Sequence, residues 1–151
     1  MAKKFIDFHI VTPERTVYSN EILEVTVPTG GGEITVLPNH IPLVSTVVTG
    51  EVRAKLSDGT THPFAVNSGI IEVQPSSKVV ILADRSELAT EIDVERAQEA
   101  YKRAQEAMKS SRDAVDIDYA RFEALMNKEL NRVKIAKRWR ENKTAQKAVL
   151  F

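Results

Sequence analysis

The sequence predicts a β domain followed by an α hairpin: an N-terminal antiparallel β-sandwich of about ten strands, then two antiparallel helices. Three observations support this fold class. Apolar residues alternate with period two between residues 4 and 83, whereas from about residue 90 they recur every three or four residues. No glycine or proline follows Pro75. We therefore expect the sandwich in residues 1–88 and the hairpin in residues 89–151.

The predicted strands are short segments rich in Val, Ile and Phe, and turn-forming residues separate them. The strand segments are FIDFHIV, EILEVTV, EITVL, GEVRAKL, HPFAV, GIIEVQ and KVVILA, and the turns include PTGGG, LPNHIP, SDGT and NSG. Asp58-Gly59 marks the clearest hairpin. Since no helix lies between these strands, we expect an antiparallel sandwich or barrel.

Each predicted helix has one narrow apolar stripe. The first stripe comprises Ala97, Tyr101, Ala104 and Met108; the second comprises Phe122, Met126, Leu130 and Val133, extended by Ala136 or Trp139. Residues 110–118 break the pattern, and Thr90 with Asp93 resembles a capping box. Such thin stripes bury little apolar area, so we expect the hairpin to depend on another surface or a ligand and to be able to move.

Composition excludes several classes of protein. The 151 residues include 21 basic and 21 acidic side chains, which gives no overall field for binding nucleic acid or membrane. The absence of cysteine excludes disulfides and thiolate metal sites and is typical of a reducing cytosol. No apolar run is long enough to span a membrane, and we expect MAKKFIDFHIV to be a first strand rather than a signal peptide.

No catalytic or metal site is predicted. His9, His40 and His62 lie in separate segments, without a His-x-x-x-His pair, a Gly-x-Ser-x-Gly elbow or a cysteine nucleophile. PTGGGEI is not followed by Gly-Lys-Ser/Thr, so it is a turn and not a P-loop.

The segment GGEITVLPNHIPLV, residues 31–44, has two prolines around Asn39-His40-Ile41, so the backbone must leave the sheet there. Asn39 tolerates a left-handed conformation in such a turn. The favoured interpretation is a corner of the sandwich. The alternative is a rigid loop that contacts a partner, with Glu33 and His40 as its polar ends.

Charged residues at helical spacing suggest an anion site. Asp93, Arg96, Ala97, Ala100 and Arg103 share one face of the first helix. With a turn near residue 114, Arg96 lies opposite Arg132, and Arg96, Arg103, Lys128 and Arg132 converge. Gathered cations repel one another unless an anion lies between them. The favoured alternative is that they point outward and pair with Glu95, Glu99 or Glu129.

The stretch from residue 128 to residue 147 holds eight basic and two acidic residues. A basic helix can bind nucleic acid, anionic lipid or an acidic protein surface. Because aromatic residues are not interleaved with the basic ones, we favour a solvated face and expect no nucleic-acid partner.

Taken together, these segments resemble the epsilon subunit of the F-type rotary ATP synthase. The resemblance runs through FHIVTPERTVYSNEI, GGEITVLPNHIPLV, FAVNSGIIEVQPSSKVVILAD and the helical hairpin. It implies a non-catalytic regulatory subunit that binds the gamma subunit and the c-subunit ring, with Glu33 and His40 toward the c ring. It also implies a hairpin that meets the alpha and beta subunits when extended and blocks ATP hydrolysis. The resemblance further implies a proton-transporting complex in which this subunit would lie peripherally, without membrane insertion, at the cytoplasmic face of the bacterial cell membrane.

The resemblance extends to an ATP-binding motif, I/L-D-x-x-R-A, that some bacterial members carry. Ile92, Asp93, Arg96 and Ala97 match it, and the same family site implies Glu87, Arg103, Lys128 and Arg132. Lys128 stands where those members have arginine, which keeps the charge but loses the planar fork. ATP is thus implied as a regulatory ligand that closes the hairpin, with no required cofactor and no prediction for Mg²⁺.

Two other functions are compatible with the pattern. The main alternative is a free-standing β-sandwich binding module with a helical dimerisation tail. Sedimentation would distinguish the two hypotheses, because the rotor subunit is expected to be monomeric in isolation and the module dimeric. A nucleic-acid binder that uses the basic helix is the weaker one, and the salt dependence of binding would test it.

Overall fold

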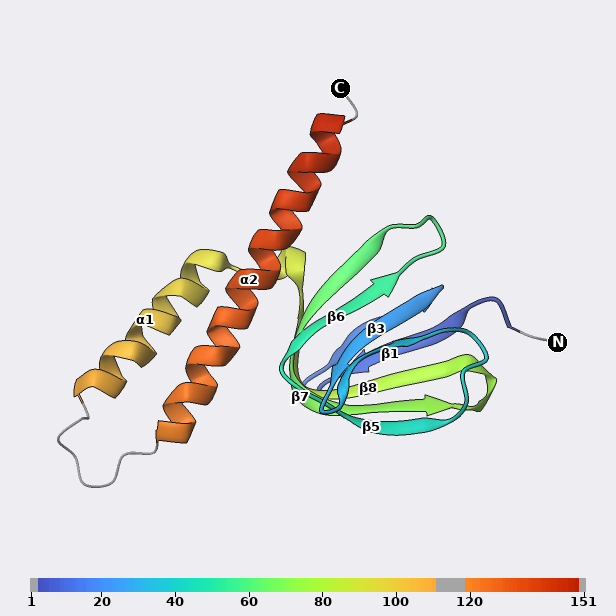
Figure 1. The fold of residues 1–151 in the computed structure, drawn as a ribbon, viewed down its shortest axis with the longest axis horizontal. Coiled ribbons are helices and arrows are strands. Elements are labelled where there is room, and N and C mark those ends of the chain that lie inside the picture. The colour runs from blue at the N-terminus through green and yellow to red at the C-terminus, as the bar shows by residue number, and fades with distance from the viewer. Residues whose placement is uncertain (1–2, 111–118, 150–151) are drawn as a thin grey trace. The chain divides into compact units, whose positions relative to one another are not determined.

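The structure, a computed structural model, describes residues 3–110 and 119–149, with side chains to residue 144 (Figure 1). The chain divides into two compact units, Met1–Ala89 and Thr90–Phe151. The predicted break at residues 110–118 lies outside the described residues from residue 111 onward.

Eight strands form the first unit within the described residues, fewer than the ten or so predicted. They are β1 (Ile6–Val11), β2 (Thr16–Ile22), β3 (Glu24–Thr29), β4 (Gly32–Val36), β5 (Leu43–Val47), β6 (Gly50–Lys55), β7 (Thr61–Gln74) and β8 (Lys78–Leu88). Short 3-10 turns follow β7 (Pro75–Ser77) and β8 (Ala89–Glu91).

The strands pair in the order β2-β1-β8-β7-β5-β3-β4, and β6 pairs with β3 and β7. All pairs are antiparallel except β1 with β8, which run parallel. The predicted antiparallel sandwich is therefore confirmed, with this one parallel pair as the exception. Parallel strands need a long connection, and β1 and β8 are the first and last strands of the unit, so the rest of the sandwich supplies that connection.

The alternating pattern places one face of each strand in the core, as predicted. In β1, Ile6, Phe8 and Ile10 are fully buried, whereas Asp7 is exposed. Buried valines of β3 and the buried Phe64 of β7 extend the same core, and the Tyr18 ring packs edge-on against Phe64. Burial of these apolar side chains is the main source of stability of the sandwich.

The predicted β6–β7 hairpin is confirmed. Gly59 takes a φ of 85° in its turn, and Asp58 accepts hydrogen bonds from the Thr60 backbone N–H (2.9 Å) and hydroxyl (2.6 Å). These two bonds, the hydroxyl bond first, lower the pKa of the Asp58 carboxyl below its ordinary value.

Strand β7 joins two parts of the sandwich. It pairs with β8 from Phe64 to Gln74, and on its other edge it pairs with β6 up to Val66 and with β5 from Gly69 onward. Ser68, between them, has a φ of 44°, and its hydroxyl donates to Asp84 Oδ2 at 2.6 Å. The segment NSG is therefore a bend inside one strand, and the prediction of a turn between two strands was wrong.

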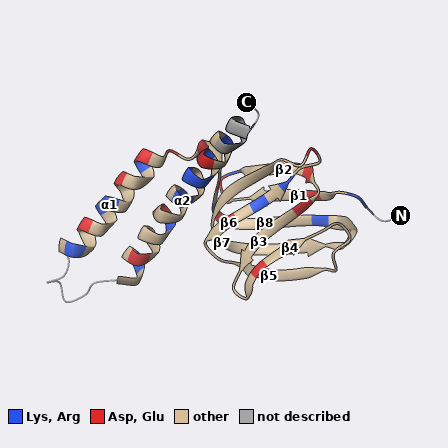
Figure 2. Cartoon of the chain, turned by 45° about the horizontal axis from the view of Figure 1, so that its top comes forward, with Lys and Arg blue, Asp and Glu red and all other residues tan. Residues whose placement is uncertain are grey.

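In the second unit, α1 (Val94–Ser110) and α2 (Tyr119–Val149) lie side by side (Figures 1 and 2). Ala97 is fully buried and Tyr101, Ala104 and Met108 are half-buried, which confirms the predicted stripe of α1. None of the described helices is long and apolar enough to cross a membrane.

The predicted stripe of α2 is wrong at one position. Leu130 is 37% exposed, whereas Glu129 is only 7% exposed. Between Met126 and Val133, the helical period allows a stripe residue at position 130 or at position 129. The first choice gives spacings of 4, 4 and 3 residues from Phe122 onward and the second gives 4, 3 and 4, and both fit a helix. The buried face of α2 therefore contains a carboxylate.

Candidate functional site

The motif Ile92-Asp93-Val94-Glu95-Arg96-Ala97 forms the start of α1. Asp93 is the N-cap: its Oδ1 accepts a hydrogen bond from the Arg96 backbone N–H at 3.1 Å, and its carbonyl accepts one from Ala97 N–H at 3.0 Å. The predicted cap at Thr90 was wrong, because the helix begins at Val94 rather than one turn earlier. The Asp93 carboxylate also lies at the positive end of the helix dipole.

Ile92 and Ala97 flank this cap at the spacing of a hydrophobic staple, the residue before the N-cap and the fourth residue of the helix. Ile92 is 3% exposed and Ala97 is fully buried. Three members of the motif thus have a local structural role in starting α1, which leaves Arg96 as the member whose side chain requires another explanation.

The Arg96 and Arg103 side chains are both exposed on α1. They lie seven residues apart, or two helical turns, and hence on one face. Within residues 3–110 and 119–144, neither guanidinium makes a hydrogen bond or ion pair. Their donors are therefore available to an anion, and an anion site on this face stays a prediction.

The two cationic residues predicted on α2 meet at one carboxylate. Arg132 Nη1 donates to Glu129 Oε2 at 2.8 Å, and Lys128 Nζ lies 3.8 Å from Glu129 Oε1. All three side chains are less than one-fifth exposed. Pairing with Glu129, the alternative considered for these cations, is thus observed on α2.

The predicted nucleotide site is divided between the two units. Glu87 is half-buried on β8 of the first unit, whereas Ile92, Asp93, Arg96, Ala97, Arg103, Lys128 and Arg132 belong to the second. The structure brings Ile92, Asp93 and Ala97 together at the helix start, and Lys128 with Arg132 at Glu129. Convergence of the complete set on one ligand stays a prediction.

The outward face of β5, β7, β8 and β1 carries exposed apolar side chains. Cross-strand pairing aligns Thr46, Ile70, Leu82 and Val11 in one row, and Val44, Glu72, Val80 and His9 in the next. Val44 is 70% exposed, Ile70 46% and Leu82 51%. We call this surface the apolar face. Apolar groups clustered in this way on a sheet mark an interaction surface.

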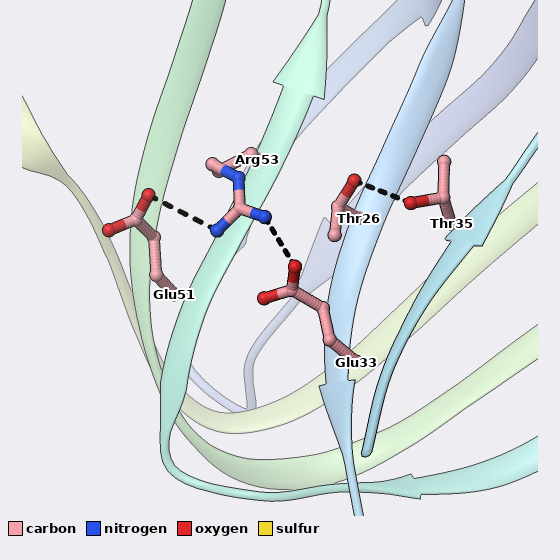
Figure 3. A network of polar contacts seen from close by, with 5 residues as sticks. All are labelled: Thr26, Glu33, Thr35, Glu51 and Arg53. Atoms are coloured by element: carbon pink, nitrogen blue, oxygen red, sulfur yellow. Dashed lines mark hydrogen bonds and ion pairs between the residues drawn. The ribbon is translucent and has the colours of Figure 1, made fainter.

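The outward face of β3, β4 and β6 is polar, as expected of a surface in water (Figure 3). Arg53 Nη2 donates to Glu33 Oε1 at 2.6 Å, Arg53 Nη1 lies 3.7 Å from Glu51, and the Thr26 and Thr35 hydroxyls are 2.9 Å apart. The hydrogen bond to Glu33 raises the pKa of the Arg53 guanidinium further above its ordinary value. The contrast between the two surfaces singles out the apolar face.

The loop after β4 is held in one shape by its asparagine. Asn39 has a φ of 64°, as predicted, its N–H donates to Ser77 Oγ at 2.7 Å, and its side-chain amide bonds the Lys3 backbone. His40 is half-buried, with Nδ1 2.6 Å from the Ile41 carbonyl oxygen. Glu33 is not a loop residue: it lies on β4 and pairs with Arg53. The exposed ends of this segment are apolar, Leu37 (53%) and Ile41 (75%).

The histidines have separate surroundings. His9 Nε2 lies 2.8 Å from Asp7 Oδ1, and the His62 ring packs edge-on against Tyr18. In the part of the chain that the structure describes, no three His, Cys, Asp or Glu side chains are grouped so as to hold a metal ion.

The cap of α1 gives a prediction about stability. Asp93→Ala is expected to lower the stability of the helix start by about 1 kcal/mol, because an N-terminal N–H loses its acceptor. Asp93→Asn keeps an acceptor and is the matched control. Hydrogen exchange at the first turn of α1 measures the effect, and equal protection in both variants would contradict the assigned cap.

Residues 5–89 match the family described as "ATP synthase, Delta/Epsilon chain, beta-sandwich domain", and residues 90–137 match its "long alpha-helix domain". An ATP synthase epsilon chain of Desulforamulus reducens is 41% identical over 127 residues, which are 84% of this chain and 93% of the relative. One of Halalkalibacterium halodurans is 39% identical over 130 residues, 86% and 96% of the two chains.

Solved structures share the fold. A chain of the Euglena gracilis mitochondrial ATP synthase (OSCP/F1/c-ring) has a TM-score of 0.70 at 18% identity and covers 91% of this chain and 83% of its own. A chain of the Tetrahymena thermophila mitochondrial ATP synthase central stalk and c-ring has a TM-score of 0.57 at 12% identity. The match covers 91% of this chain and 98% of the Tetrahymena chain.

Proposed function

Because the chain belongs to the delta/epsilon chain family of ATP synthase, we propose that it is a non-catalytic subunit of the central rotor stalk, the epsilon subunit. It joins the catalytic head to the c ring of a proton-transporting enzyme and acts peripherally at the cytoplasmic face of the bacterial membrane. The observation that carries this proposal is the apolar face, a surface suited to a permanent protein partner on a chain 41% identical to an epsilon chain.

The partner proposed for the apolar face is the gamma subunit. Val44, Ile70 and Leu82 come from three paired strands, so they offer a rigid surface that binding need not reorganise. We assign the loop with Leu37, His40 and Ile41 to the c ring, since Leu37 and Ile41 expose apolar side chains there and Asn39 fixes its backbone. Glu33, paired with Arg53, has a smaller part in that contact.

The hairpin is the regulatory part of the proposal. ATP binds the exposed Arg96 and Arg103 of α1 together with Lys128 and Arg132 of α2, and thereby holds the helices together. Without ATP the hairpin extends toward the alpha and beta subunits and stops ATP hydrolysis. Exposed basic residues of α2, among them Lys134, Lys137 and Arg140, then meet acidic protein surface. ATP shifts this balance only by its preference for the closed form.

Calorimetric titration of the purified chain with ATP, alongside its thermal melt, tests the regulatory part. One-to-one binding with a raised melting temperature is expected. Arg96→Ala should weaken binding at least about tenfold, because a charge-assisted contact to phosphate is lost while the Arg96 backbone N–H still bonds the Asp93 cap. Arg121→Ala, on the exposed surface of α2, is the control. An Arg96→Ala protein with wild-type affinity would exclude Arg96 from the site.

Sedimentation of the chain with its gamma subunit tests the stalk role. The expected result is a monomer alone and a one-to-one complex in the mixture. A stable homodimer that does not bind the gamma subunit would instead favour a free-standing module with a dimerisation tail.

A further inference from the structure

The feature without a place in the proposed function is the buried carboxylate of α2. Glu129 is 7% exposed and lies at a stripe position, three residues after Met126 and four before Val133. Carboxylates are almost never buried unless they are paired, because removal from water disfavours the charge. Its burial therefore depends on its two cationic neighbours.

Those neighbours are the two α2 residues of the proposed ATP site. Glu129 Oε2 accepts a hydrogen bond from Arg132 Nη1 at 2.8 Å, and Oε1 lies 3.8 Å from Lys128 Nζ. The Arg132 and Lys128 side chains are themselves only 19% and 17% exposed. One internal anion thus contacts both groups that would otherwise contact phosphate.

We propose that Glu129 is a built-in competitor for the phosphates of ATP, which occupies Lys128 and Arg132 while the nucleotide is absent and so sets the ATP concentration at which the hairpin closes. This inference rests on the proposed nucleotide site. A phosphate oxygen needs the same N–H donors, so it must displace the carboxylate or bind beside it. In either case the repulsion between two anions lowers the affinity for ATP.

A purely structural ion pair would give the opposite result. If Glu129 only stabilises the hairpin, its neutralisation removes the ion pairs that it makes with Lys128 and Arg132 and weakens the folded form. ATP binding, which requires the folded form, would then become weaker. If Glu129 is a competitor, neutralisation makes ATP binding tighter. The sign of the change in affinity separates the two roles.

The experiment is calorimetric titration of the full chain with ATP for the wild type, Glu129→Gln and Glu129→Met. Gln keeps the shape of the side chain without its charge, and Met is an apolar helix former suited to a stripe position. Glu141→Gln removes one charge from an exposed position of the same basic helix and controls for net charge. Helical circular dichroism reports whether each hairpin is folded.

We expect both Glu129 variants to bind ATP about tenfold more tightly and Glu141→Gln to bind as the wild type does. If both Glu129 variants bind ATP as the wild type does or more weakly, the inference is overturned, whether or not helical signal is lost. In that case binding of ATP by the wild-type chain still supports the proposed nucleotide site. If one variant fails to fold, the other decides. If neither the wild type nor the variants bind millimolar ATP, the proposed site itself fails and the inference fails with it.

Discussion

A chain with aspartate at both Val44 and Leu82 is expected to lose at least about a hundredfold in affinity for the gamma subunit. Both side chains are more than half exposed, on β5 and β8 of the apolar face, so the substitutions can be accommodated in the free sandwich. In the complex, however, two unpaired carboxylates would be buried against apolar surface. That desolvation cost falls on the complex alone, which is why a large loss of binding is expected without a large loss of stability.

Sedimentation or calorimetry with purified gamma measures this loss. Thr35→Asp is the matched control, since it adds a carboxylate at an exposed position of the polar face, and it should bind gamma as the wild type does. Urea unfolding of each variant verifies the fold. Wild-type affinity in the doubly substituted chain would show that gamma binds elsewhere.

Gly69→Ala is expected to lower the free energy of unfolding by about 3 kcal/mol. A Cβ at this position would lie 2.2 Å from the Leu82 carbonyl oxygen and 2.9 Å from Ala83 Cα, so the backbones of β7 and β8 would have to separate. This is where β7 changes its neighbour from β6 to β5, and β7 is paired on both edges there. Neither strand can move without losing other hydrogen bonds.

Urea denaturation measures this effect, and Gly31→Ala is its control. A methyl group at Gly31 meets nothing within 4 Å, so that variant should unfold near the wild-type midpoint. Gly69→Ala should also weaken gamma binding, because Ile70 of the apolar face follows directly. Equal midpoints for the two variants would contradict the assigned approach of β7 to β8.

Features that depend only on neighbouring residues could be predicted from the sequence. Alternation of apolar side chains gave the buried face of β1, the Asp58-Gly59 turn gave the β6–β7 hairpin, and two prolines around Asn39 gave its left-handed bend. The stripe of α1 followed from its period in the same way. Local steric preferences and side-chain spacing carry this information, so a single segment suffices to predict each feature.

Contacts between segments distant in the sequence, in contrast, could not be predicted from the sequence pattern. The NSG segment predicts a turn at Gly69, because the close approach of β8 is not visible in the segment itself. The parallel pairing of β1 with β8 joins residues distant in sequence, and period alone could not choose between Glu129 and Leu130. In the candidate site, the motif residues could be identified from the sequence. The N-cap role of Asp93 and the staple formed by Ile92 and Ala97 could not. Burial and ion pairing arise from long-range packing, and that packing decided that a carboxylate lies between Lys128 and Arg132.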